Sequence, residues 1–439
     1  MQPVPTVAPL TPEMDPRLKS WRMRIFAATW LSYFAFYFCR RPFYVAKSSI
    51  EEHFAIDATI LGYLGLAYLA SYTIGQFVAG WAGNKWGPRL LLLTGMAGSV
   101  ACNVVFGFTD SVWTFGAFLF LNGLAQATGW SGNVGAMAPW FHRRERGTVM
   151  GLWATNFQVG GVVATALASW VLGTYGFQWS FLTGSVVLSV VWVFFLFNQR
   201  NEPEDVGLPP VHSPVPEDDL LEDATTEEVP ADALDEDDAP WTRDTKINVA
   251  IVGTFYFFVK FIRYAIWSWV PYMLYVSYGM DRAEAGYLSV AFDAAGILGV
   301  VTLGFLSDRY FSGRRAGISF LFMGGMAAAC VLLFLLGPTS LVMFGVCLAL
   351  IGFTLYGPDA IMTSAGAIDV GSRKKATLAA GIINGMGSVG AMVQEVVLGR
   401  VLGDGDVAAV FSVLLLSSVL AAFCLGVLLL RNQQGRAAM

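Results

Sequence analysis

Two adjacent arginines lie near the start of the chain, inside an apolar stretch long enough to cross a membrane, in the sequence YFCRRPF at 37–43. A guanidinium at bilayer depth costs about 2.5–3.5 kcal/mol even on the lenient insertion scale, so it is rarely kept without a use. If the stretch is helical, the i, i+4, i+7, i+11 spacing places four side chains on one face: Tyr33, Tyr37, Arg40 and Tyr44. The stretch therefore predicts a cationic and aromatic helix face inside the membrane.

The same pattern recurs 223 residues later in the chain, where the matching positions are Tyr256, Lys260, Arg263 and Trp267. An arginine fork from each half of the chain suits a multivalent oxyanion, and phosphate is the leading candidate. A second interpretation is that Arg40 and Arg263 are structural cations neutralised by carboxylates. Three acidic residues lie within apolar segments and would be available as buried charge partners: Asp293, Asp359 and Glu395.

Composition excludes most soluble classes. The 439 residues are 55% hydrophobic and 13% charged, and the mean hydropathy is +0.57, whereas a soluble domain carries about 25% charged residues. The sequence contains no nucleophile–histidine arrangement, no cluster of metal-ligating residues and no phosphate-binding glycine loop outside a helix. We therefore expect an all-α polytopic membrane protein that is not an enzyme, binds no metal, cofactor or nucleic acid, and is a monomer in the bilayer.

Apolar segments of spanning length predict twelve helices, in two six-helix bundles at 21–199 and 247–430. The segments are 21–50, 58–81, 88–108, 112–140, 147–173, 177–199, 247–277, 282–306, 315–337, 339–365, 375–402 and 406–430. The linker at 200–246 contains sixteen acidic residues and many prolines, a composition that predicts a disordered tether. The alternative is a regulatory docking segment. Residues 1–20 and 431–439 are predicted to be tails.

The distribution of lysine and arginine predicts the orientation in the membrane. Most cations lie before the first segment, in every second turn, in the linker and in the tail, which places both termini in the cytoplasm. Three cations are assigned to the opposite side: Lys47, Arg282 and Arg400.

The turns that close the second and eighth segments also repeat, as GWAGNKWGPR at 80–89 and as GFLSDR at 304–309 followed by GRR at 313–315. A glycine allows two helix ends to approach closely, and the basic residues hold the cytoplasmic surface. We expect these turns to control the conformational change through Gly80, Asn84, Gly87, Arg89, Gly304, Asp308, Arg309 and Arg314. A parallel repeat of six helices is a transporter arrangement with its site at the midplane between the halves.

These features resemble the major facilitator superfamily, and within it the organophosphate:phosphate antiporters, the group of glycerol-3-phosphate and hexose-6-phosphate carriers. The resemblance runs through nearly all twelve segments. Its most specific stretches are YFCRRPF at 37–43, WFHRRERG at 140–147, RYAIWSW at 263–269 and YGP at 356–358. At the first signature turn Asn84 replaces the family's aspartate, which the second copy retains as Asp308.

The resemblance implies a secondary transporter of the cell (inner) membrane. Such a carrier exchanges a phosphorylated organic anion for inorganic phosphate by alternating access, and its phosphate ligands fall on Arg40 and Arg263. The family's pocket tyrosines fall on Tyr33, Tyr37, Tyr72 and Tyr356. Two alternatives stay open: a membrane sensor of hexose phosphate, which the same family includes, and a proton-coupled organic-anion symporter.

Three positions depart from the glycerol-phosphate carriers. Gln76 replaces a lysine, Phe157 replaces a histidine, and Lys260 replaces a tyrosine one turn before Arg263, so one cation has moved from the second segment to the seventh. Lys260 is expected either to contact the substrate or to pair with Asp293. Four polar side chains are expected either to line the substrate site or to join helices by hydrogen bonds: Asn156, Gln158, Asn384 and Ser388.

Overall fold

The computed structural model describes residues 16–141, 146–211, 241–310, 315–337, 340–363 and 376–435. Within these ranges all regular structure is helical, and ten helices are long and apolar enough to cross a membrane. The expected all-α membrane fold is confirmed.

Each of the twelve expected segments contains helix. The N-terminal half contains α1 (Pro16–Phe36), η2 (Tyr37–Cys39), α2 (Arg41–Val45), α3 (Lys47–Phe54), α4 (Ala58–Trp86), α5 (Pro88–Phe108), α6 (Val112–Met137), η3 (Ala138–Trp140), α7 (Arg146–Trp153), α8 (Thr155–Tyr175) and α9 (Phe177–Asn198). The C-terminal half contains α11 (Arg243–Tyr278), α12 (Arg282–Tyr310), α13 (Arg315–Leu336), α14 (Leu341–Thr363), α16 (Ala376–Gly403) and α17 (Val407–Gln433).

The first and fourth expected spans are the two that fall outside the ten apolar helices. The first span is divided into α1, η2, α2 and α3, and the fourth, α6, carries the buried amides Asn122, Gln126 and Asn133. Amides of α6 bind the backbone where the first span is divided.

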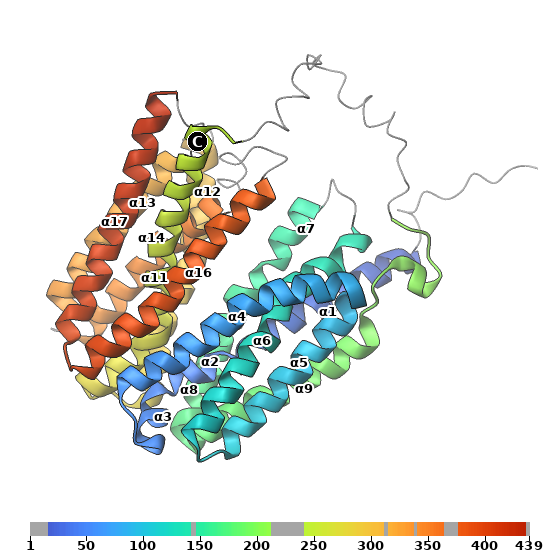
Figure 1. Cartoon of the computed structure of the whole chain (residues 1–439), viewed down its shortest axis with the longest axis horizontal. Coiled ribbons are helices and arrows are strands. Elements are labelled where there is room, and N and C mark those ends of the chain that lie inside the picture. Colours follow the sequence, from blue (N-terminus) through green and yellow to red (C-terminus); the bar gives the residue numbers. More distant parts are fainter. Residues whose placement is uncertain are drawn as a thin grey trace, which may run out of the picture.

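The two halves lie next to each other, with the blue-to-green helices in one bundle and the yellow-to-red helices in the other (Figure 1). They converge at the end that carries α3 and diverge toward the end where α9 stops and α11 starts, called here the α3 end and the linker end. Between the halves, α4 contacts α16, α8 contacts α12, and α2 and α3 contact α11.

The first span is not one continuous helix, which corrects the expectation of a single face through Tyr33, Tyr37, Arg40 and Tyr44. The α-helix ends at Phe36, a 3₁₀ turn covers 37–39, and a new helix starts at Arg41. Pro42 accounts for the break, because its ring clashes with the carbonyl four residues earlier and it has no N–H to donate.

Amide side chains of neighbouring helices bind the carbonyl groups at this break. The carbonyl oxygen of Cys39 accepts hydrogen bonds from Asn103 Nδ2 at 3.2 Å and Asn122 Nδ2 at 3.1 Å. The carbonyl oxygen of Phe36 accepts one from Gln126 Nε2 at 3.1 Å. Since a free carbonyl inside a membrane bundle is costly, these amides allow the break to exist.

The predicted linker boundaries change at both ends. Residues 200–211 pack against the N-terminal half, with η4 (Pro203–Val206) and the buried side chains Leu208 and Val211. At the other end α11 begins at Arg243. The central residues 212–240, which carry most of the acidic composition, lie outside the described residues.

The contact between α4 and α16 at the α3 end depends on glycine. A Cβ atom added at Gly62 would lie 2.5 Å from the carbonyl oxygen of Glu395, and one added at Gly399 would lie 2.9 Å from that of Ala58. The two helix backbones therefore touch, and the halves meet there with no side chain between them.

We expect Gly62→Ala to separate the halves at the α3 end, because its methyl group cannot fit beside the Glu395 carbonyl without a cost of about 1–3 kcal/mol. The distance between spin labels at exposed Asp110 and Asp404, both at the α3 end, should lengthen. The control is Gly80→Ala on the same helix, where an added Cβ meets nothing within 4 Å. An unchanged distance distribution in Gly62→Ala would show that this contact does not limit the closed arrangement.

Candidate functional site

Arg40 lies at the break in the first span, between η2 and α2, and the residue is 8% exposed. Its Nε and Nη2 both donate to Oε1 of Gln126, at 3.3 and 3.0 Å. The rings of Tyr37 and Tyr72 lie 4.9 and 5.1 Å from the guanidinium carbon. All of these partners are neutral, so in the described part of the chain Arg40 is a buried cation held in place without a carboxylate.

Gln126 contacts the candidate ligand Arg40 and was not among the residues that the sequence analysis singled out. Its amide group joins Arg40, the Phe36 carbonyl and Ser99 Oγ, the last at 2.8 Å. Gln126 therefore couples the position of the guanidinium to the break in the helix. A glutamine in the middle of an apolar segment was the available signal, since such amides are uncommon there without a partner.

Of the predicted pocket tyrosines in the N-terminal half, Tyr37 and Tyr72 flank Arg40, whereas Tyr33 belongs to an aromatic cluster. The ring of Tyr33 lies 5.7 Å from each of the rings of Trp130 and Trp153, and 6.0 Å from that of Tyr37. Tyr33 thus packs against Tyr37, and its ring contacts are with aromatic side chains.

Arg263, the matching arginine of α11, has a different environment. Its Nη1 donates to Oδ2 of Asp359 on α14, and the two side chains form an ion pair that is 12% and 7% exposed. The rings of Tyr264 and Trp267 lie 5.5 and 5.1 Å from its guanidinium carbon. The two arginines are therefore not equivalent, although their sequence patterns match: Arg40 is held by an amide and Arg263 by a carboxylate.

Lys260 lies one turn before Arg263 and reaches α16. Its Nζ donates to Asn384 Oδ1 at 2.8 Å and to Ser388 Oγ at 3.4 Å. The predicted ion pair between Lys260 and Asp293 is wrong, because Asp293 Oδ2 accepts instead from Arg41 Nη2 at 2.9 Å. The predicted polar residues Asn384 and Ser388 are thus brought together with Lys260.

Asp293 is the centre of a network that crosses between the halves. Besides Arg41 of the N-terminal half, it accepts hydrogen bonds from Trp267 Nε1 at 2.7 Å and from the Tyr356 hydroxyl. The Arg41 guanidinium carbon also lies 4.2 Å from the centre of the Trp267 ring. Tyr356, expected to line the pocket, is therefore used to hold this carboxylate.

Glu395, the third buried acid, pairs with Lys47, which the sequence analysis assigned to the side opposite the termini. Lys47 Nζ lies 2.8 Å from Glu395 Oε2, and both side chains are fully buried. Ser268 Oγ donates to the other carboxylate oxygen at 2.5 Å, and the Trp269 ring lies 3.3 Å from Nζ. Lys47 is buried and not on the far surface, because α3 packs against α11 and Lys47 meets Glu395 of α16.

Part-buried and exposed contacts between the halves complete the α3 end. The Tyr272 and Tyr275 hydroxyls donate to Glu51 and Glu52, each at 2.8 Å, and Arg282 pairs with Glu52. The hydrogen bond from Tyr275, together with Arg282, lowers the pKa of Glu52, which therefore stays charged at neutral pH.

The remaining predicted substrate-binding residues do not join this cluster. Gln76 and Gln158 are half-buried, and the fully buried Asn156 makes no hydrogen bond to a described residue through its amide atoms.

The predicted gating residues lie in the turns at the linker end. Arg89 binds Leu196 and Asn201 of its own half, and Asn84 is exposed. Gly87 ends α4 and has a φ of 81°. Added Cβ atoms at Gly80 and Gly304 meet nothing within 4 Å. The side chains of Asp308 and Arg309, and all of Arg314, lie outside the described residues.

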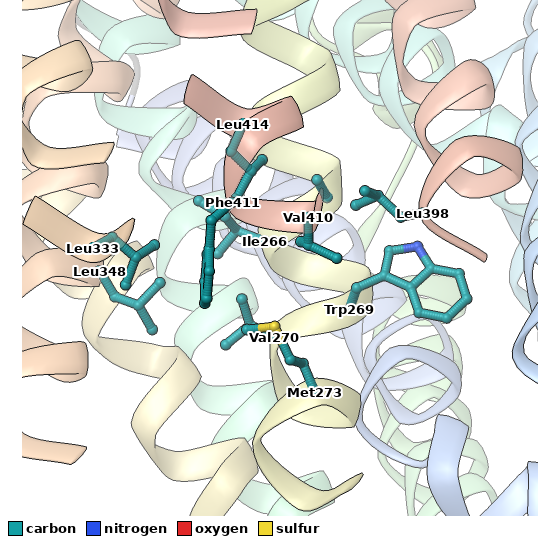
Figure 2. A pocket seen from close by; sticks show the side chains of 11 residues that line it. Ile266, Trp269, Val270, Met273, Leu333, Leu348, Leu398, Val410, Phe411 and Leu414 are labelled. Carbon is teal, nitrogen blue, oxygen red and sulfur yellow. The ribbon is translucent and has the colours of Figure 1, made fainter. Parts of the chain in front are cut away.

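A small apolar cavity inside the C-terminal half is separate from these charges. Figure 2 shows Ile266, Trp269 and Met273 of α11 facing Leu348 and Phe411 across it. Because no charged side chain lines this cavity, it does not suit a phosphate.

Two six-helix bundles with ionic groups at mid-length between them define a secondary transporter fold. The sequence model of the Major Facilitator Superfamily matches residues 29–243 and 251–438. The chain belongs to this superfamily, which confirms the recognition made from the sequence and the expectation of a transporter fold rather than an enzyme.

Curated relatives lie in the branch that the motifs indicated. The chain is 27% identical over 421 residues to the membrane sensor protein UhpC of Escherichia coli, covering 94% of this chain and 93% of that one. It is 31% identical to the putative glycerol-3-phosphate transporter 1 of Arabidopsis thaliana, over 85% and 75% of the two chains. Among solved structures, a bacterial homologue of the human lysosomal transporter Spinster, in an inward-facing and unoccupied conformation, superposes with a TM-score of 0.72 at 14% identity, over 96% and 99% of the chains.

Proposed function

We propose that the protein exchanges a phosphorylated organic anion for inorganic phosphate by alternating access. The observation that carries this proposal is the charge inside the bundles. Five buried or nearly buried cations, Arg40, Arg41, Lys47, Lys260 and Arg263, face three carboxylates, Asp293, Asp359 and Glu395. The described interior therefore holds two positive charges without a protein counterion, and a phosphate group supplies two negative charges.

The same charge balance gives a reason for obligatory exchange. Closing the halves around two uncompensated cations would remove them from water, which is costly without a partner. A bound phosphate group neutralises them and lowers that cost, so the loaded carrier crosses and the empty carrier does not. Rocking of one bundle against the other would open the α3 end and close the linker end.

The proposal includes an orientation and a location. The excess of lysine and arginine at the linker end supports a cytoplasmic linker end with both termini in the cytoplasm. A carrier exposed to organophosphates on one side and cytoplasmic phosphate on the other fits the inner membrane. The turns at the linker end are proposed to close the cytoplasmic side in the opposite conformation.

The test is uptake of labelled phosphate and of phosphate esters into proteoliposomes. We expect uptake to require phosphate inside the vesicles and to proceed without an imposed proton gradient. Uptake that required an inward proton gradient and ignored internal phosphate would show a proton symporter instead. Vesicles without protein and vesicles with Arg40→Gln are the controls.

A sensor is the second candidate, because UhpC, similar along 94% of this chain, is named a membrane sensor. It predicts binding of a phosphate ester by purified protein without movement of label into vesicles. Binding and flux measured on the same preparation separate the two functions.

A further inference from the structure

Lys260 and Arg263, two cations of α11 that lie one turn apart, differ in their partners. Arg263 is bound to the Asp359 carboxylate, so most of its charge is already balanced within the protein. Lys260 is bound to an amide oxygen and a hydroxyl oxygen, with the Tyr256 ring 4.9 Å from its Nζ. Among the described contacts of this pair, the uncompensated charge of the C-terminal half belongs to the lysine.

A ligand could reach Lys260 beside Asn384, and the ammonium group has a further N–H to donate to it. Its partner Asn384 is exposed, and added Cβ atoms at Gly381 and Gly385 of the same helix would meet nothing within 4 Å. An ammonium group has three N–H donors, and the contacts with Asn384 and Ser388 use two of them. Gly387 leaves room for the lysine stem, because a Cβ there would lie 2.9 Å from Lys260 Cδ.

A phosphate dianion at Arg263 would have to share the guanidinium with Asp359. Two anions on one cation repel each other, and in a bundle interior that repulsion is weakly screened. A phosphate group between Arg40 and Lys260 meets two cations whose own partners are neutral. The charge distribution thus favours an asymmetric pair of ligands over the two matched arginines.

We propose that Lys260, and not Arg263, supplies the second positive charge to the bound phosphate group, and that Arg263 with Asp359 is a positioning pair. The inference rests on the proposed function. It also narrows the substrate class, since Arg40 and Lys260 match the two charges of a phosphate monoester whose organic part is neutral. An added carboxylate on the substrate would bring a third charge with no matching cation.

The test uses Lys260→Met and the double variant Lys260→Met with Asp359→Asn. Lys260→Met should weaken phosphate binding at least ~10-fold, because a cation in the site is lost. Asp359→Asn releases the Arg263 guanidinium from its counterion, so the double variant should recover most of the affinity. Lys260→Arg should retain binding better than Lys260→Met, and thermal unfolding in detergent would check that each variant is folded.

The matched control is Lys260→Met with Asp293→Asn. It restores the same net charge but releases Arg41, so it should not recover phosphate affinity. Wild-type affinity in Lys260→Met, or equal recovery by both double variants, would overturn the assignment. If glycerol phosphate and a phosphorylated carboxylic acid competed equally well for the wild-type site, the substrate class would be wrong. Absence of phosphate exchange by the wild-type protein would instead defeat the proposed function.

Discussion

Arg40→Lys should lower the affinity for inorganic phosphate at least ~10-fold while leaving the fold intact. The guanidinium uses Nε and Nη2 for Gln126 and lies near the faces of Tyr37 and Tyr72, which leaves its other N–H groups for a ligand. A lysine keeps the charge, but it cannot hold Gln126 and present a planar fork at the same time. Binding of phosphate to purified protein, together with exchange in proteoliposomes, measures the effect.

Arg41→Lys is the matched control for this prediction. The two arginines are adjacent, but Arg41 contacts Asp293 through one nitrogen, a contact that a lysine can also make. We expect a smaller loss of affinity than in Arg40→Lys. Equal losses in the two variants would mean that Arg40 has no special role as a phosphate ligand.

Lys47→Met should destabilise the protein by about 3–5 kcal/mol, because it leaves the Glu395 carboxylate buried without its cation. Both side chains of this pair are fully buried, and they join α3 to α16 across the two halves. The double variant Lys47→Met with Glu395→Gln removes both charges and should recover much of the stability. Thermal unfolding in detergent gives the comparison.

An exposed ion pair at the same end of the molecule is the control for Lys47. Arg282 and Glu52 also join the two halves, but their side chains are 29% and 55% exposed. Such pairs contribute about 0–1 kcal/mol, so Arg282→Met should change the unfolding temperature little. If Lys47→Met were as mild as Arg282→Met, water would have to reach the buried pair.

The fold could be predicted from the sequence, because long apolar runs have few stable alternatives to membrane-spanning helices. The sequence was also sufficient to single out Arg40, Lys260 and Arg263, since each is a charge in an apolar segment. It did not show the break in the first span, although Pro42 stood next to the arginines. Assuming one continuous helix placed Tyr44 on the cationic face, whereas its hydroxyl is buried and makes no hydrogen bond to a described residue.

Residue spacing in the sequence could not predict which cation pairs with which buried carboxylate. Asp293 could reach a cation on α11 or one on the first span, and only the packing of the two halves decided for Arg41. For the same reason the matched sequence patterns of Arg40 and Arg263 concealed their different partners. Periodicity reports which face of a helix a residue occupies, whereas ion pairs depend on the distance between helices.

The two uncompensated positive charges inside the bundles also determine how the membrane potential acts on the proposed cycle. Moving one elementary charge across the membrane is worth about 2.3 kcal/mol per 100 mV. A carrier holding a phosphate ester dianion presents no net charge at the site, so the potential does no work on its crossing. The empty form would carry two charges through the same field. The membrane potential therefore changes the energy of the empty carrier's return, which transports nothing. The rate of the proposed exchange should not depend on the membrane potential.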